Sequence, residues 1–266
     1  MIPAIHAATA CVPGVTVERA IQQIHEGLDE PLLGTLDAGC IQICPQSPGY
    51  LHEARCETIA ATWPQTRFRL HANARVFQTH QLLDASTFDE QTRPYFKALA
   101  DRSRRLGATG YSLHAGYRCN ASLGRMLDNL KQIQTLFGDI PVAVEGLYRN
   151  DKRPQLMDSW SEYETVLRSG ALVAVDCSHL NIVARTEKSK DAGLMADLLA
   201  SDQTIEVHLS ANDGRADHHD LLAEEPFWWP LLNQVGRNAV VFSEGDQLRA
   251  ERRKRANLHA TFRLAE

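Results

Sequence analysis

The segment VAVDCSH, residues 173–179, joins a short apolar run to an acidic residue and, three positions later, a histidine. A run of valine and alanine without polar alternation is typical of a strand buried on both faces, as the strands of parallel sheets are. Asp176 and His179 fall where this strand ends. The segment therefore predicts a parallel strand that carries functional side chains at its carboxyl end.

The same arrangement repeats along the chain, because short apolar segments alternate with longer segments of helical periodicity. The predicted strands are Ala4–Thr9, Cys40–Cys44, Arg67–Ala72, Gly110–Ala115, Pro141–Gly146, Leu172–Cys177, Thr204–Ser210 and Ala239–Glu244. The predicted helices are Thr16–Leu28, Tyr50–Thr62, Phe88–Leu106, Leu123–Phe137, Ser159–Arg168, Lys188–Leu199, Phe227–Val235 and Gln247–Ala265.

Eight strand–helix units predict parallel strands that close into a barrel, with the helices outside. An open doubly wound sheet is the alternative, but no GxGxxG motif follows any of the strands. We therefore predict an α/β protein with a single (β/α)8 TIM barrel that spans residues 1–266 as one domain.

Six consecutive predicted strands, from the third to the eighth, deliver an imidazole or a carboxylate at their carboxyl ends, where functional groups of such barrels gather. Crowded carboxylates and imidazoles in one crevice are costly to bury unless a cation lies between them. Histidine ligands suit zinc, manganese or iron. The sequence thus predicts a metal site formed by His71, His114, Glu145, Asp176, His179, His208, Asp217, His219 and Glu244.

The seventh strand continues into the polar stretch IEVHLSANDGRADHHD, Ile205–Asp220. Residues 212–214, Asn-Asp-Gly, have the composition of a turn that folds the loop back towards the strand end. This interpretation makes His208, Asp217 and His219 ligands, whereas His218 alternates away from the site.

Composition excludes several functions. The net charge of −5, from 28 Lys+Arg and 33 Asp+Glu, provides no basic excess for nucleic-acid binding. The six cysteines show no CxxC spacing, and residues 1–14 do not resemble a signal peptide, so we expect a reduced, cytoplasmic protein. No apolar run approaches the ~20 residues that span a bilayer. The oligomeric state is not indicated.

The residues at the strand ends resemble those of the xylose isomerase-like TIM barrel superfamily, and most of all those of endonuclease IV, which holds three zinc ions. The resemblance extends from His71 to Glu244, over nearly the whole chain. It implies that Glu145 bridges two metals and that "HAG", "DCSH" and "DHHD" supply ligands as the family's corresponding motifs do. The implied cofactor is a set of up to three divalent ions, zinc with manganese or iron as alternatives.

The chain also departs from the endonuclease IV pattern. No aromatic residue follows His71 in "ANAR", Ala115 replaces the proline of a His-Pro-Gly turn, and Gly146 replaces the asparagine that usually follows the bridging glutamate. With the acidic net charge, these departures favour a small-molecule phosphoester or sugar substrate over DNA, and no membrane partner.

Three ions in one crevice suit phosphoester hydrolysis, with Glu145 orienting the attacking hydroxide. Arg118, Arg149 and Arg215 lie just beyond strand ends, so they are candidates for binding the phosphate.

Three other functions remain open. A sugar isomerase or epimerase would need one metal, held by the equivalents of Glu145, Asp176, His208 and Glu244, with Glu145 and Glu244 moving a proton. A multinuclear non-heme iron oxygenase would place iron on the same ligands. A metal-dependent binding barrel would use them without chemistry. Metal content separates the hydrolase from the isomerase, since we expect three ions per chain for the hydrolase and one for the isomerase.

Overall fold

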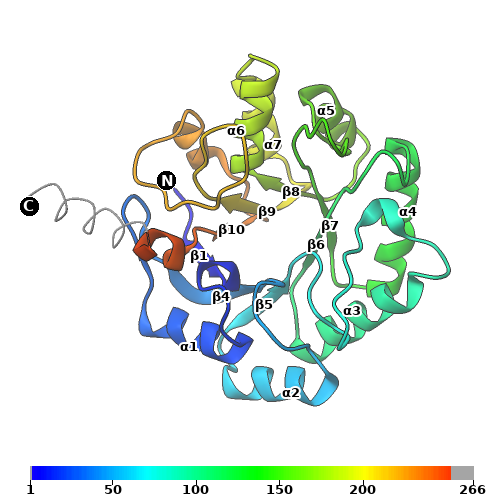
Figure 1. The fold of residues 1–266 in the computed structure, drawn as a ribbon, viewed down its shortest axis with the longest axis vertical. Coiled ribbons are helices and arrows are strands. Elements are labelled where there is room, and N and C mark those ends of the chain that lie inside the picture. The colour runs from blue at the N-terminus through cyan, green and yellow to red at the C-terminus, as the bar shows by residue number, and fades with distance from the viewer. Residues whose placement is uncertain (1, 253–266) are drawn as a thin grey trace, which may run out of the picture.

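The computed structural model describes residues 2–252 and contains a closed barrel of eight parallel strands (Figure 1). The strands are β1 (Ile5–Ala8), β4 (Asp37–Ile43), β5 (Arg67–Leu70), β6 (Tyr111–His114), β7 (Val142–Glu145), β8 (Val173–Asp176), β9 (Thr204–Leu209) and β10 (Val240–Ser243). They follow one another around the barrel in chain order, and β10 closes it against β1. The predicted (β/α)8 TIM barrel is confirmed. The first and last residues of each predicted strand lie within three residues of those of an observed strand.

Helices surround the barrel, as Figure 1 shows. They are α1 (Val17–Glu26), α2 (Glu53–Thr62), α3 (Arg93–Leu106), α4 (Leu123–Phe137), α5 (Trp160–Arg168), α6 (Cys177–Thr186) and α7 (Ala192–Ala200). Three short 3-10 helices, η1 (Thr9–Cys11), η2 (Ala85–Thr87) and η3 (Trp229–Gln234), and a two-stranded sheet, β2 (Asp29–Glu30) with β3 (Gly34–Thr35), complete the described elements.

The helix boundaries follow local capping chemistry. The Thr16 side chain accepts a hydrogen bond from the Arg19 backbone N–H at the start of α1. At the other end of α3, Gly107 adopts the left-handed conformation that glycine permits without strain. Both α1 and α3 therefore lie inside their predicted ranges.

The helix predictions differ from the structure in two places. No helix was predicted between the strand Leu172–Cys177 and residue 188, but α6 begins directly after Asp176, whose carboxylate accepts hydrogen bonds from the backbone N–H groups of Ser178 and His179. The predicted helix over residues 227–235 is the 3-10 helix η3, with Pro230 in its first turn. Residues 247–252 are helical, and the rest of the helix predicted to residue 265 lies outside the described residues.

Successive side chains of each strand point alternately towards the surrounding helices and into the barrel. On β8, Val173 and Val175 share one face while Ala174 and Asp176 share the other. Arg69, Ser112 and Glu206 each precede a predicted ligand, His71, His114 and His208, by two residues, so they lie on the same interior side one layer closer to the amino ends of the strands. Across residues 2–252, no helix has the length and apolar character that crossing a bilayer requires.

Candidate metal centre

The structure brings the nine predicted ligands together at the carboxyl ends of the strands. Eight of them line one cavity of about 220 Å3: His71, His114, Glu145, Asp176, His179, Asp217, His219 and Glu244. The ninth, His208, is fully buried beside them, with its Nδ1 atom 3.6 Å from Glu145 Oε1 and 3.9 Å from Glu244 Oε1.

Glu145 stands at the centre of this group. Its Oε2 atom lies 3.3 Å from His71 Nε2 and 3.7 Å from His114 Nε2. Its Oε1 atom lies 3.4 Å from His179 Nδ1 and 3.6 Å from His208 Nδ1. One carboxylate thus reaches imidazoles from four different strands or strand ends, as a bridging ligand would.

The loop after β9 supplies the other side of the cavity. Asp217 Oδ2 lies 2.8 Å from His219 Nε2 and 3.3 Å from His179 Nε2. His219 Nδ1 lies 3.6 Å from Glu244 Oε2. His219 has a φ of 48°, a left-handed conformation that costs a non-glycine residue free energy and often marks a functional site.

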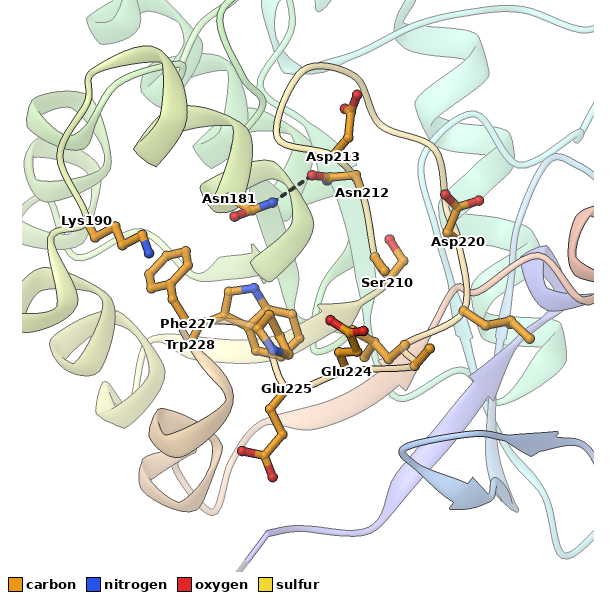
Figure 2. Close-up of a pocket in the computed structure, with 15 residues that line it drawn as sticks. Asn181, Lys190, Ser210, Asn212, Asp213, Asp220, Glu224, Glu225, Phe227 and Trp228 are labelled. Carbon is orange, nitrogen blue, oxygen red and sulfur yellow. Dashed lines mark hydrogen bonds between the residues drawn. The ribbon is translucent and has the colours of Figure 1, made fainter.

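Asn212 holds this loop against α6, and Figure 2 shows its side chain facing that of Asn181. Asn212 Oδ1 accepts from Asn181 Nδ2 and from the Gly214 backbone N–H, both at 2.8 Å. Asn212 Nδ2 donates to the Ser178 carbonyl, also at 2.8 Å. The predicted turn is therefore anchored to the helix that carries His179, which places Asp217 beside that histidine.

His218 points elsewhere, as its alternation predicted. Its Nε2 atom lies 3.5 Å from Asp213 Oδ1, and its Nδ1 atom lies 3.2 Å from Arg249 Nη2. His218 and His219 are adjacent in sequence but belong to different environments.

The donor set fits divalent metal ions. Three groups, each with ligand atoms within 4.8 Å of one another, are His71–His208–Glu244, His71–His114–Glu145 and Glu145–Asp176–His179. Within residues 2–252, Glu145 Oε2, His208 Nδ1, His219 Nδ1 and Glu244 Oε1 are buried without a hydrogen-bond partner. Buried polar atoms are nearly always partnered, so four such atoms around one cavity point to a cation that they would coordinate.

Burial and neighbouring charges shift the pKa values of several groups in this cavity. Burial lowers the pKa of His71 to about 3, so its imidazole is neutral. Burial opposes ionisation of Glu145, but the neighbouring His208 holds the pKa of Glu145 well below its usual range. Burial opposes protonation of His208 too, yet Glu244 and Glu145 raise the His208 pKa well above its usual value. Burial raises the pKa of Glu244 to about 7. Burial also opposes protonation of His219, yet its hydrogen bond with Asp217 raises the His219 pKa to about 9.

Two histidines are oriented by partners that sequence reasoning did not identify. His179 Nδ1 lies 2.9 Å from the Gly146 carbonyl oxygen, so this nitrogen donates and Nε2 faces Asp217. His71 Nδ1 lies 2.9 Å from the Ser112 hydroxyl, two residues before His114 on β6. The two-residue spacing was the available signal, because it places both side chains on the interior face of one strand.

Gly146, where the family pattern has asparagine, has a physical explanation. A Cβ atom on Gly146 would overlap the buried ring of Tyr163. The Tyr163 hydroxyl donates to the Leu147 carbonyl at 3.1 Å and so holds the chain that follows Glu145. In this protein the tyrosine from α5 occupies the space that an asparagine side chain would need.

The three arginines predicted to bind phosphate do not line this cavity in the described part of the chain. Arg118 pairs with Asp158 at 2.7 Å and with Glu162 at 2.8 Å, and Arg149 pairs with Asp151 at 2.9 Å. Arg215 is exposed on the outer loop. Carboxylates of the segment after β7 and of α5 hold the first two arginines away from the metal centre.

Two aromatic residues that no sequence pattern identified form part of the cavity wall. Tyr117 and Tyr148 both contribute to the lining. The ring of Tyr148 lies 5.1 Å from that of His179, measured between centroids, and the Arg153 guanidinium lies 3.6 Å from the Tyr117 ring centroid. Arg153 therefore places a positive charge beside the cavity wall.

No family model and no curated protein sequence matches the chain. Solved structures do match, and one is a D-tagatose 3-epimerase-like protein with 13% identity, a TM-score of 0.68, and coverage of 99% of this chain and 100% of that one. AP endonuclease, family 2 from Brucella melitensis matches with 14% identity, a TM-score of 0.64, and coverage of 92% and 93%. Endonuclease IV from Thermus thermophilus matches with 17% identity, a TM-score of 0.57, and coverage of 91% and 92%.

These similarities confirm the predicted resemblance at the level of the fold. The chain has the fold of xylose isomerase-like TIM barrel proteins, among which both epimerases and endonucleases occur. At such identities the fold does not decide the reaction, which must be argued from the site.

Proposed function

We propose that this protein is a metal-dependent hydrolase of phosphoesters whose site holds up to three divalent ions, zinc with manganese or iron as alternatives. The observation that carries the proposal is a set of three donor groups linked in series. His71 belongs to the first and the second group, and Glu145 belongs to the second and the third. A one-metal enzyme would need Glu145, Asp176, His208 and Glu244 alone. The additional histidines and Asp217 around the same cavity support a multinuclear centre.

In the proposed reaction, divalent ions would supply Lewis-acid chemistry, which polarises a phosphoryl group and lowers the pKa of a water molecule. His71, His114, Glu145, Asp176, His179, His208, Asp217, His219 and Glu244 would hold the ions. Glu145 is ionised and has a buried oxygen without a hydrogen-bond partner among the described residues, so it can orient the attacking water by accepting its proton in a hydrogen bond.

The cavity supports a small substrate. At about 220 Å3 it is smaller than the typical ligand pocket, and no lysine or arginine among residues 2–252 lines it, whereas binding of a nucleic-acid duplex relies on basic side chains. Arg153, rather than Arg118, Arg149 or Arg215, is the cation placed beside the lining residue Tyr117. We therefore propose a small-molecule phosphoester, including sugar phosphates, in preference to DNA.

A sugar isomerase or epimerase with one catalytic metal is the second candidate. It is favoured by the fold similarity to the D-tagatose 3-epimerase-like protein. Glu145 and Glu244 both approach His208 Nδ1, within 3.6 and 3.9 Å, so two carboxylates flank one ligand position, as proton transfer beside a carbonyl requires.

Metal content tests the proposal. Elemental analysis of protein purified without added metal should approach three ions per chain, and anomalous scattering should place them among the three donor groups. Hydrolysis of bis(4-nitrophenyl) phosphate should depend on those ions. A single ion, coordinated by Glu145, Asp176, His208 and Glu244, would instead establish the one-metal alternative.

Metal affinity should rise with pH between about 6 and 9. His219 has a pKa of about 9 and Glu244 of about 7 without metal, so both carry protons at pH 6 that coordination must displace. His71, with a pKa of about 3, is already neutral and contributes nothing to this slope. Competition with a chelator of known pH dependence measures the affinity, and an affinity that is constant from pH 6 to 9 would contradict the expected proton release.

A further inference from the structure

A chain of buried polar side chains lies inside the barrel, below the metal centre. Glu206 precedes His208 by two residues on β9, and both are fully buried. Strand alternation points both side chains into the barrel. Arg69 on β5 and Gln42 on β4, also buried, reach the same carboxylate. A buried ion pair is costly to desolvate and is therefore weak evidence for a purely stabilising role.

Glu206 is fully engaged by these neighbours. Arg69 Nη1 donates to Glu206 Oε1 at 3.1 Å and to the Ile205 carbonyl at 2.6 Å. Gln42 Nε2 donates to Glu206 Oε2 at 2.9 Å. His208 Nε2 lies 3.1 Å from the same Oε2 atom. The arginine and the amide thus hold the carboxylate in place and direct an acceptor at the imidazole.

This arrangement selects one tautomer of His208. A neutral imidazole has one N–H and one lone pair, and an ionised carboxylate only accepts hydrogen bonds. In the neutral form of His208, which metal coordination requires, the nitrogen that faces Glu206, Nε2, must therefore carry the proton. Nδ1 then presents its lone pair towards the cavity, where it has no hydrogen-bond partner among residues 2–252.

The opposite tautomer is less favourable, although Gln42 Nε2 lies 2.9 Å from His208 Nε2 and its second N–H could donate a hydrogen bond to a lone pair there. It would set a lone pair against the Glu206 carboxylate. It would also bury an N–H at Nδ1, whose neighbouring carboxylate oxygens on Glu145 and Glu244 lie 3.6 and 3.9 Å away, beyond normal hydrogen-bond distance.

We propose that Glu206, held by Arg69 and Gln42, is a positioning residue that keeps His208 protonated at Nε2 and so presents its Nδ1 lone pair to a metal ion. The inference rests on the proposed function for the identity of the ligand. A carboxylate that accepts the second N–H of a metal-bound histidine fixes ring orientation and strengthens the ligand. Here the same strand supplies both members of the pair.

Burial opposes protonation of His208, but Glu244 and Glu145 raise its pKa well above the usual value. Nuclear magnetic resonance of the metal-free, ¹⁵N-histidine-labelled protein therefore tests the tautomer at a pH at which His208 has lost one proton. Long-range ¹H–¹⁵N correlations, assigned by comparison with His208→Gln, should show His208 as the Nε2–H form. An Nδ1–H form would overturn the inference whatever metal the protein binds.

Substitution tests the consequence for metal binding. Glu206→Gln should weaken zinc binding at one of the sites by about 10- to 100-fold in chelator competition and populate the second tautomer of His208. Because Glu206→Gln leaves the buried Arg69 unpaired and can prevent folding, the double variant Arg69→Met/Glu206→Gln removes both charges and provides an independent measurement.

The matched control is Glu18→Gln. Glu18 also pairs with an arginine, Arg55, through two contacts of 2.6 Å, but on the outer helices α1 and α2. The Glu18→Gln variant should bind zinc with the affinity of the wild type. Wild-type affinity in both Glu206 variants would overturn the inference. Failure of the wild type to bind zinc, with the Nε2–H tautomer present, would overturn the proposed function instead.

Discussion

Replacing Glu145 with alanine should abolish phosphoester hydrolysis and deplete the protein of metal. Glu145 is within 3.7 Å of ring nitrogens of His71, His114, His179 and His208, so its loss removes the group shared by two of the three donor sets. We expect kcat/KM for bis(4-nitrophenyl) phosphate to fall by about four orders of magnitude, as for other central catalytic groups. Elemental analysis should show the loss of metal in parallel.

The matched control is Glu164→Gln. Glu164 pairs with Arg168 on the outer face of α5 and does not line the cavity. It should retain wild-type activity and metal content. A Glu145→Ala protein that is folded by circular dichroism and keeps both its metal and its activity would refute the assignment of Glu145. Loss of metal without any measurable hydrolysis in the wild type would refute the hydrolase proposal but not the metal centre.

Replacing Asp217 with alanine should separate a multinuclear hydrolase from a one-metal isomerase. Asp217 contacts His179 and His219 and belongs to none of the four ligands that a one-metal enzyme needs. In a three-ion hydrolase the substitution should remove about one ion per chain and lower hydrolysis by more than about 100-fold, since losing even an outer partner of a ligand can cost that much. A one-metal epimerase would keep its ion and most of its activity.

His218→Ala is the control from the same loop. Its side chain contacts Asp213 and Arg249 and lies outside the cavity lining. It should therefore leave metal content unchanged, although it removes a histidine adjacent to the proposed ligand His219. Equal metal losses in Asp217→Ala and His218→Ala would show that the loop is merely unfolded, which contradicts a ligand role for Asp217.

The barrel could be predicted from the sequence because its signal is local. Each strand is a short, largely apolar run, such as residues 173–176, and six of the eight carry an imidazole or a carboxylate at or near the carboxyl end. Where prediction failed, the local signal was ambiguous. The carboxylate of Asp176 serves both as a candidate ligand and as the N-cap of α6, and its sequence does not reveal that a helix starts at the next residue.

The same local reasoning could nominate the nine ligand candidates, since all lie at or after strand ends. It could not tell which arginines lie beside the cavity. Arg118 and Arg149 lie beyond strand ends as predicted, yet carboxylates from α5 and its preceding segment hold them outside the cavity. Arg153, with the same side chain a few residues later, stacks on Tyr117 instead. Which cation meets which partner depends on contacts between segments distant in sequence.

By itself, the sequence determined the strand order, the interior face of each strand and the set of imidazoles and carboxylates at one end of the barrel, because alternation and strand length are properties of the local chain. Only the tertiary structure decided that Glu145 lies among four imidazoles, that Tyr163 fills the space beside Gly146, and that Arg69 and Gln42 hold Glu206 against His208. These are distances between side chains on different strands and helices, and closure of the barrel sets them.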